Sequence, residues 1–345
     1  MEAFLNQSRM FLKVAESNIA TPKRPYKLHF YVTDKCNFKC NMCNIWRKPT
    51  DGELSEEEIA LFFKNNNYFS WIDITGGEIF LRKDIEHIFH QMIGECKHLC
   101  FIHFPTNGFL TKRIVSCVEN MNKQFSGKIV ITISIDGPKE KHELIRGVSS
   151  WDRAIETFKS LEKINPGNNF FGMTLSLHNA DMVEQTYQAL RAEIPSLSPN
   201  KVHLNVAHAS AHYYSNEKLE FRADKEALVK GIDVLMKKRH FEFSPFFAVE
   251  HEFLSLLKKY VLDGKHPLKR CSALTSTITV NPRGEVYPCL FFDRKLGSLR
   301  ETNFELMPIL EGEDAQAIKK NILDHCPHCW SACEAYPSLL ANIVR

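Results

Sequence analysis

Short β-rich runs alternate with amphipathic helical patterns along most of the chain from Tyr26 onward. Six runs rich in apolar and β-branched residues predict strands at Lys27–Thr33, Phe69–Thr75, Leu99–Pro105, Lys128–Ile135, Asn169–Leu177 and Lys201–Ala207. Apolar residues recur at helical spacing near residues 55–66, 83–95, 111–123, 151–165, 181–193 and 223–239. Successive β-α units form a parallel sheet with helices outside. Because six units are too few for an eight-stranded barrel, we expect an α/β fold with a partial (β/α)6 TIM-like barrel, whose ligands bind at the carboxyl ends of the strands.

The regions outside this barrel have different patterns. Residues 1–25 predict an N-terminal amphipathic helix with Phe4, Leu5, Phe11, Leu12 and Ala15 on one side. It is expected to pack on the barrel of residues 26–240, with contact to a membrane surface as the weaker alternative. Residues 241–270 predict a helical connector. Residues 271–345 predict a small domain: a β-hairpin turning at residues 281–284, then helices near residues 304–322 and 333–343.

Composition excludes several classes of protein. The chain has 345 residues, a formal net charge of +3 and 44% hydrophobic residues. Its basic runs are short, so we expect no nucleic-acid partner. No run of 18 apolar residues exists, and charged residues interrupt any secretory signal, so the expected location is cytoplasmic.

Eleven cysteines are many for a chain expected in a reducing compartment, where disulfides are rare. Three of them, Cys36, Cys40 and Cys43, have the spacing C-x3-C-x2-C directly after the first predicted strand. Thiolates are soft ligands that suit iron–sulfur centres, and three on a four-iron cluster leave one iron open. Structural zinc is the alternative, but it needs four ligands, and the first candidate for a fourth is as distant as His87.

This loop resembles the signature of the radical S-adenosylmethionine (SAM) superfamily, in which the open iron binds SAM. The resemblance implies that Gly76, Gly77 and Glu78 bind SAM as the GGE motif at the end of the second strand. It also implies a SAM carboxylate held by Ser134 and Arg146, and a pocket lined by Asn107 and Asp136, although either could instead form a turn. One departure is Met42, where the family commonly has an aromatic residue.

Five further cysteines resemble the SPASM/Twitch extensions of this superfamily: Cys271, Cys289, Cys326, Cys329 and Cys333. A full SPASM domain needs about seven, so the resemblance implies the shorter Twitch form. Its one auxiliary [4Fe–4S] cluster would be ligated by Cys271, Cys289, Cys326 and Cys329, with zinc as the alternative. Cys333 is then a buried helix residue, a replacement ligand or a thiol hydrogen donor. The cofactors implied are two [4Fe–4S] clusters and SAM.

The implied chemistry is reductive cleavage of SAM to a 5′-deoxyadenosyl radical, which takes a hydrogen atom from an unactivated carbon. An auxiliary cluster with no open iron favours subsequent oxidation of a small polar, sugar- or cyclitol-like substrate. The alternatives are maturation of a peptide, modification of a lipid-linked substrate, or epimerisation with Cys333 as hydrogen donor. The implied electron donor is a flavodoxin or a ferredoxin. A polar loop after the sixth strand, with His208, His212, Tyr213 and Tyr214, could bind the substrate, as could His178.

Overall fold

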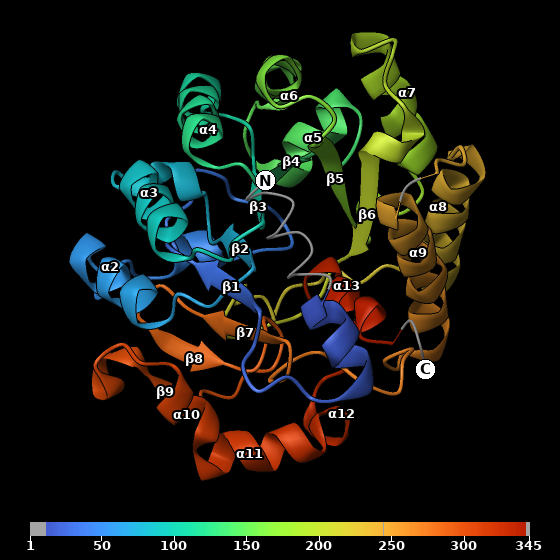
Figure 1. The fold of residues 1–345 in the computed structure, drawn as a ribbon. Helices are drawn as coiled ribbons and strands as arrows, with labels where there is room; N and C mark the ends of the chain where they lie inside the picture. Colours follow the sequence, from blue (N-terminus) through green and yellow to red (C-terminus); the bar gives the residue numbers. More distant parts are fainter. Residues whose placement is uncertain (1–11, 244, 343–345) are drawn as a thin grey trace.

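The computed structural model describes residues 12–243 and 245–342, shown as a ribbon in Figure 1. In this part of the chain, nine strands form one sheet in the order β6-β5-β4-β3-β2-β1-β7-β8-β9. The six barrel strands are all parallel to their neighbours. They are β1 (Lys27–Tyr31), β2 (Trp71–Thr75), β3 (Phe101–Thr106), β4 (Lys128–Ser134), β5 (Asn169–Leu175) and β6 (Val202–Val206). The open, partial barrel that the sequence predicts is therefore confirmed.

Helices cover the outer face of this sheet (Figure 1). They are α2 (Glu56–Asn65), α3 (Ile85–Glu95), α4 (Thr111–Gln124), α6 (Trp151–Ile164), α7 (Val183–Glu193) and α8 (Lys225–Lys238), with the short α5 (Lys139–Arg146) at one end. Phe30 of β1 shows how the two layers pack, because its ring lies 5.6 Å from those of Phe62 and Phe63 of α2. Side chains alternate along a strand, so His29 and Tyr31 point to the barrel interior.

The C-terminal hairpin is part of the barrel sheet. Strand β7 (Thr277–Val280) pairs in parallel with β1, and β8 (Glu285–Tyr287) and the short β9 (Gly297–Ser298) follow antiparallel. The predicted hairpin is confirmed, but the sequence did not indicate its parallel pairing with β1. The sheet continues across the predicted domain boundary at residue 271. That boundary stays a prediction.

The helices after the barrel are more broken than the sequence predicts. The connector contains α9 (Pro245–Asp263). The single helix expected near 304–322 is wrong: the segment forms α10 (Met307–Glu311), α11 (Glu313–Lys320) and α12 (Ile322–His325). Gly312, at the junction of the first two, has an extended backbone that ends one helix and starts the next.

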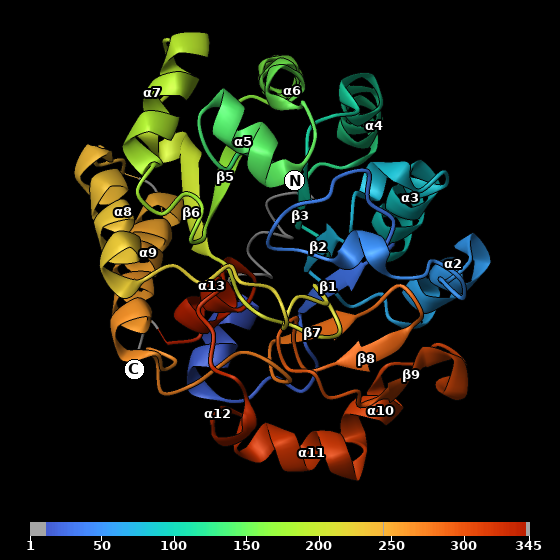
Figure 2. The same cartoon turned by 180° about the vertical axis from the view of Figure 1, so that it is seen from behind.

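Two further helices lie near the barrel interior. Helix α13 (Ala332–Leu340) lies between β6 and β7 in both Figure 1 and Figure 2, on the open side of the barrel. Residues 12–19 form a helix whose Lys13 bonds the carbonyl of Tyr68 and whose Asn18 bonds the carbonyl of Leu340. Of the apolar side predicted for it, Phe4, Leu5 and Phe11 lie outside the described residues, and Leu12 is 65% exposed. No helix in the described part of the chain could cross a membrane.

Candidate active site

The loop that carries Cys36, Cys40 and Cys43 leaves the carboxyl end of β1 and covers the barrel at that end. All three are free thiols, largely shielded from solvent. Burial raises the pKa of Cys36 and of Cys43 to about 12, and it raises the pKa of Cys40 as well. Such thiols stay protonated by themselves, whereas a bound metal centre releases their protons and supplies compensating positive charge.

The GGE segment holds this loop in place. The amide of Gly77 donates to the carbonyl of Thr33 at 2.8 Å, and the amide of Glu78 donates to the carbonyl of Lys35 at 2.8 Å. A Cβ on Gly77 would collide with the Lys35 carbonyl, and one on Gly76, where φ is +148°, would collide with the Thr33 carbonyl. The two glycines therefore let the end of β2 approach the backbone that leads into Cys36.

Glu78 and Asn107 join the next strand to the same loop. The buried carboxyl of Glu78 accepts from the hydroxyl of Thr106 at 3.0 Å and from the amide of Asn107 at 2.8 Å. Burial raises the pKa of Glu78 to about 7, against the effect of these hydrogen bonds. The side-chain amide of Asn107 donates to Asn37 within the cysteine loop at 2.8 Å. Both residues thus lie at the site, and each one positions the cysteine loop.

An ion pair lies against the second cysteine. Arg146 Nε lies 2.7 Å from Asp136 Oδ2, and Arg146 Nη1 lies 3.8 Å from Cys40 Sγ. Asp136 is fully buried, and burial raises its pKa while Arg146 opposes that rise. Ser134 ends β4 and shares the interior face of that strand with Thr132, whose hydroxyl bonds His103. The structure therefore brings Arg146 and the predicted pocket residue Asp136 together beside Cys40, while Ser134, the other predicted carboxylate-binding residue, ends the neighbouring strand.

The loop after β6 clamps the cysteine loop from the other side. The amide of Asn44 donates to the carbonyl of Tyr214 at 2.9 Å, and the side chain of Asn216 donates to the carbonyl of Met42 at 2.8 Å. Met42 packs with Ile145 and Phe221 in a small apolar cluster. The sequence did not single out Asn216, because its role depends on a contact 174 residues away.

The polar residues of this loop and of the preceding one have separate environments. His212 Nδ1 lies 2.6 Å from Asp293, and its ring stacks on Tyr287 at 4.0 Å. The ring of His208 packs against Phe291, and burial lowers the pKa of His208 to about 4. The hydroxyl of Tyr213 bonds that of Thr75. Half-buried His178 lies after β5, where burial lowers its pKa. These residues do not form one polar substrate-binding cluster.

The second cysteine set comes together around the hairpin. Cys271 precedes β7, Cys289 follows β8, and Cys326 and Cys329 follow α12. Burial raises the pKa of Cys271 to about 12, and it raises those of Cys289 and Cys329 well above the usual range. Neighbouring thiols add to this rise: Cys326 acts on Cys271, and Cys271 acts on Cys289 and Cys329. Four neighbouring thiols, two of them buried and two partly buried, suit a centre that carries positive charge.

Cys333 lies apart from this set. Its pKa is raised to about 12 by burial and then by Asp73, whereas Lys27 lowers it; none of the four other cysteines is among the causes. Its backbone carbonyl accepts from Lys27 Nζ at 2.7 Å. Cys333 therefore belongs to the barrel interior.

Across residues 12–243 and 245–342, no group of three or more His, Cys, Asp or Glu side chains has the arrangement of a site for a single metal ion.

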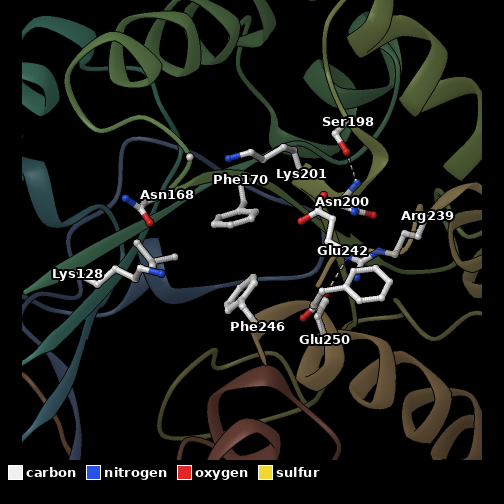
Figure 3. A pocket seen from close by; sticks show the side chains of 13 residues that line it. Lys128, Asn168, Phe170, Ser198, Asn200, Lys201, Arg239, Glu242, Phe246 and Glu250 are labelled. Atoms are coloured by element: carbon white, nitrogen blue, oxygen red, sulfur yellow. Dashed lines mark hydrogen bonds and ion pairs between the residues drawn. The ribbon is translucent and has the colours of Figure 1, made fainter. Parts of the chain in front are cut away.

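One well-formed cavity lies elsewhere. A space of about 160 Å³ is lined by Lys128 at the start of β4, Phe170 near the start of β5 and Lys201 just before β6 (Figure 3). These positions are the amino ends of the strands, opposite the cysteine loop. The cavity is therefore not part of the candidate active site.

Two family models match the chain. That of the radical SAM superfamily covers residues 30–190, and that of an iron–sulfur cluster-binding domain, SPASM, covers residues 271–333. Similar curated proteins include a probable GTP 3′,8-cyclase of Saccharolobus islandicus, 25% identical over 86% of this chain and 90% of that protein. Another is the antilisterial bacteriocin subtilosin biosynthesis protein AlbA of Bacillus subtilis, 25% identical over 81% of this chain and 59% of AlbA.

Solved structures share the fold. The enzyme anSMEcpe with bound AdoMet (SAM) has a TM-score of 0.61 at 18% identity, over 85% of this chain and 83% of that one. SuiB of Streptococcus suis bound to SAM has a TM-score of 0.62 at 15% identity, over 91% of this chain and 72% of SuiB.

Proposed function

Because the chain belongs to the radical SAM superfamily and carries a SPASM cluster-binding domain, we propose that it removes a hydrogen atom from a carbon of its substrate and then oxidises the substrate radical. The cofactors are two [4Fe–4S] clusters and SAM. The observation that carries the proposal is the presence of two separate sets of free cysteines that are partly or fully buried, three at the barrel mouth and four around the hairpin. The first set leaves one iron open, and the second leaves none.

The residues of the first site have distinct roles in this proposal. Cys36, Cys40 and Cys43 hold the first cluster, which with SAM supplies a 5′-deoxyadenosyl radical when bound. Arg146 and Ser134 hold the SAM carboxylate. Asp136 neutralises the buried guanidinium group of Arg146 and fixes its orientation. Gly77 and Glu78 bond the end of β2 to the loop, and in this proposal the segment of Gly76, Gly77 and Glu78 would bind the SAM ammonium.

The second set has a different role. Cys271, Cys289, Cys326 and Cys329 hold the auxiliary cluster, which takes up the electron that the substrate radical loses. A flavodoxin or a ferredoxin delivers the electron needed to start each turnover at the first cluster. An open iron at the second site would instead allow direct binding of substrate.

We propose a peptide as substrate, in place of the sugar- or cyclitol-like molecule expected from the sequence. AlbA takes part in the biosynthesis of a bacteriocin, and fold neighbours include SuiB bound to a precursor peptide and anSMEcpe bound to a peptide. A nucleotide is the second candidate, because of the similarity to a probable GTP 3′,8-cyclase.

Cluster content tests the first part of the proposal. Anaerobic reconstitution should give about eight iron and eight sulfide per chain, as two four-iron clusters require. Replacing Cys36, Cys40 and Cys43 together by Ala should leave about four of each and abolish SAM cleavage. Zinc in place of the remaining iron would refute the auxiliary cluster.

Product analysis tests the second part. The reconstituted enzyme is incubated in D2O with SAM, reductant and either a library of peptides or GTP. Oxidation of a peptide predicts a product lighter by two hydrogens, with 5′-deoxyadenosine formed in step and no solvent deuterium in the product. A cyclised GTP product would favour the second candidate. Solvent deuterium in a product of unchanged oxidation state, lost in Cys333→Ala while SAM cleavage continues, would show epimerisation instead.

A further inference from the structure

A row of ionisable side chains, each within 3.5 Å of the next, crosses the barrel interior below the first cluster loop, and the proposed roles above do not use it. Glu334 Oε1 of α13 lies 3.4 Å from His29 Nε2, and His29 Nδ1 lies 3.2 Å from Asp73 Oδ2. On the other side of that carboxylate, Asp73 Oδ1 lies 3.5 Å from His103 Nδ1. We call Glu334, His29, Asp73 and His103 the interior chain.

The sheet register explains why these groups meet. His29 of β1 is directly opposite Asp73 of β2, and Asp73 is directly opposite His103 of β3. Neighbouring positions in a parallel sheet point to the same face, so the three side chains form a row across the interior. Helix α13 closes the open side of the barrel and adds Glu334 to the end of the row.

The positive and negative side chains in and beside the interior chain are equal in number when His103 is not counted. Lys27 Nζ lies 2.8 Å from Asp73 Oδ2, and its side chain is fully buried. Burial and Lys27 lower the pKa of His29, but the two flanking carboxylates outweigh them, and the net pKa is raised. Two cations, Lys27 and His29, thus face two carboxylates, Asp73 and Glu334. Glu334 also lies close enough to raise the pKa of four thiols, those of Cys271, Cys289, Cys329 and Cys333.

One end of the chain reaches the auxiliary site. Glu334 accepts from the hydroxyl of Thr277 at 2.5 Å and from that of Ser272 at 3.3 Å. Ser272 follows Cys271 directly, so an electron added to an auxiliary cluster there places a negative charge beside an already balanced, buried array. Uncompensated charge in such surroundings is costly.

The other end of the interior chain, at His103, is partly exposed to solvent. The side chain of His103 is 27% exposed, compared with 0–7% for His29, Asp73 and Glu334. His103 Nε2 lies 3.0 Å from the hydroxyl of Thr132. The register partner of His103 on β4 is Val130, which lines the cavity of Figure 3. The wall of that cavity therefore lies next to His103 on the sheet.

We propose that the interior chain takes up one proton through His103 when the auxiliary cluster is reduced, so that electron and proton arrive together. In turnover the electron comes from the substrate radical, and the proton comes from water at the partly exposed side chain of His103. The auxiliary cluster goes from the 2+ to the 1+ state, and the chain gains one positive charge, so the total charge of the buried region is unchanged. Reoxidation of the cluster returns the proton to water. This inference rests on the auxiliary cluster assigned in the proposed function.

The test is the pH dependence of the reduction potential, measured without substrate. The reconstituted, two-cluster protein is titrated with dithionite, and the auxiliary signal is followed by electron paramagnetic resonance across the range where histidine titrates, about pH 5 to 8. One proton per electron predicts a potential that falls by about 59 mV per pH unit, the tenfold value for a one-electron couple. A potential that does not change with pH overturns the inference and leaves the proposed function intact.

A matched pair of variants locates the proton. His103→Asn removes the imidazole at the exposed end of the interior chain. The change of the reduction potential per pH unit should then fall toward zero, with the auxiliary cluster retained. His87→Asn is the control, because His87 lies on the outer helix α3, pairs with Glu56 at 2.8 Å and is not part of the chain; its slope should stay as in the wild type. An unchanged slope in His103→Asn would refute the role of that residue. Absence of a second cluster signal in the wild type would refute both the proposed function and this inference.

Discussion

Replacing Asp73 by Asn removes one negative charge from the centre of the barrel and leaves the shape of the side chain unchanged. Asp73 lies within 2.8 Å of Lys27 Nζ and 3.2 Å of His29, and its other oxygen accepts from Trp71 Nε1 at 2.7 Å. The Trp71 bond can persist to an amide oxygen. The two cations, whose side chains are fully buried, lose their shared counter-charge.

The expected loss of folding free energy is about 3–5 kcal/mol, the range for removing one partner of a buried ion pair. The lower half of that range applies here, because Lys27 keeps the Cys333 carbonyl at 2.7 Å and the face of the Trp71 ring at 3.9 Å. The solvent-accessible pair of Lys258 and Asp233 is the matched control. Asp233→Asn should cost only about 0–1 kcal/mol, as surface pairs do.

Urea unfolding of the reconstituted wild type and of both variants, followed by tryptophan fluorescence, measures these differences. The result also has a pH signature. The neighbouring cations hold the pKa of Asp73 well below its usual value against the opposing effect of burial, so its contribution is present above the unfolded pKa of about 3.9 and is lost as pH falls through the folded pKa. The wild type and Asp73→Asn should therefore converge in stability in strong acid. A cost no larger than that of Asp233→Asn at neutral pH would refute the reasoning.

Two shorter predictions concern the cysteine loop, and a third concerns the loop after β6. Arg146→Ala should weaken SAM binding about ten- to a hundredfold, since a hydrogen bond to a charged group contributes on the order of 1.5–3 kcal/mol; equal SAM affinities by equilibrium dialysis would place the SAM carboxylate elsewhere. Gly77→Ala should lower the iron content of the first site while leaving the auxiliary cluster, because its Cβ would displace the Lys35 carbonyl; iron analysis and electron paramagnetic resonance distinguish the two sites, and full occupancy would contradict the packing. Asp293→Asn should cost about 1.5–3 kcal/mol in urea unfolding at neutral pH, because a charged acceptor for His212 is lost; a midpoint equal to that of the wild type would show that the pair is not stabilising.

The strands and helices of the barrel could be predicted because their patterns are local. Alternating apolar residues in Lys128–Ser134, and helical spacing in Trp151–Ile164, reflect which face of each element is buried, and neighbouring residues carry that signal. The segment near 304–322 was predicted as one helix because its apolar residues recur at helical spacing. The structure interrupts it at Gly312 and Asn321, where packing on the end of the sheet competes with helix propensity.

The candidate active site likewise has features that the sequence predicts and features that only the structure shows. Spacing identified the first cysteine set, because three thiols within eight residues of loop are held close by the chain itself, whereas the second set was predicted from its resemblance to SPASM/Twitch extensions. The sequence also suggested Arg146 as a ligand-binding residue, but its pairing with Asp136 and its contact with Cys40 depend on the closing of β4 and α5 over the loop. Asn216 carries no local signal at all.

By itself, then, the sequence determined the order of elements, the open parallel barrel and the loop of the first three cysteines, all of which depend on residues near one another in the chain. Only the tertiary structure decided that β7 pairs with β1 and that α13 closes the barrel. Those two contacts bring Glu334 to His29 across 305 residues of chain. His29 and Asp73 look like ordinary strand positions in sequence, because the burial that makes a charge costly, and a partner necessary, exists only once the sheet has curved around them.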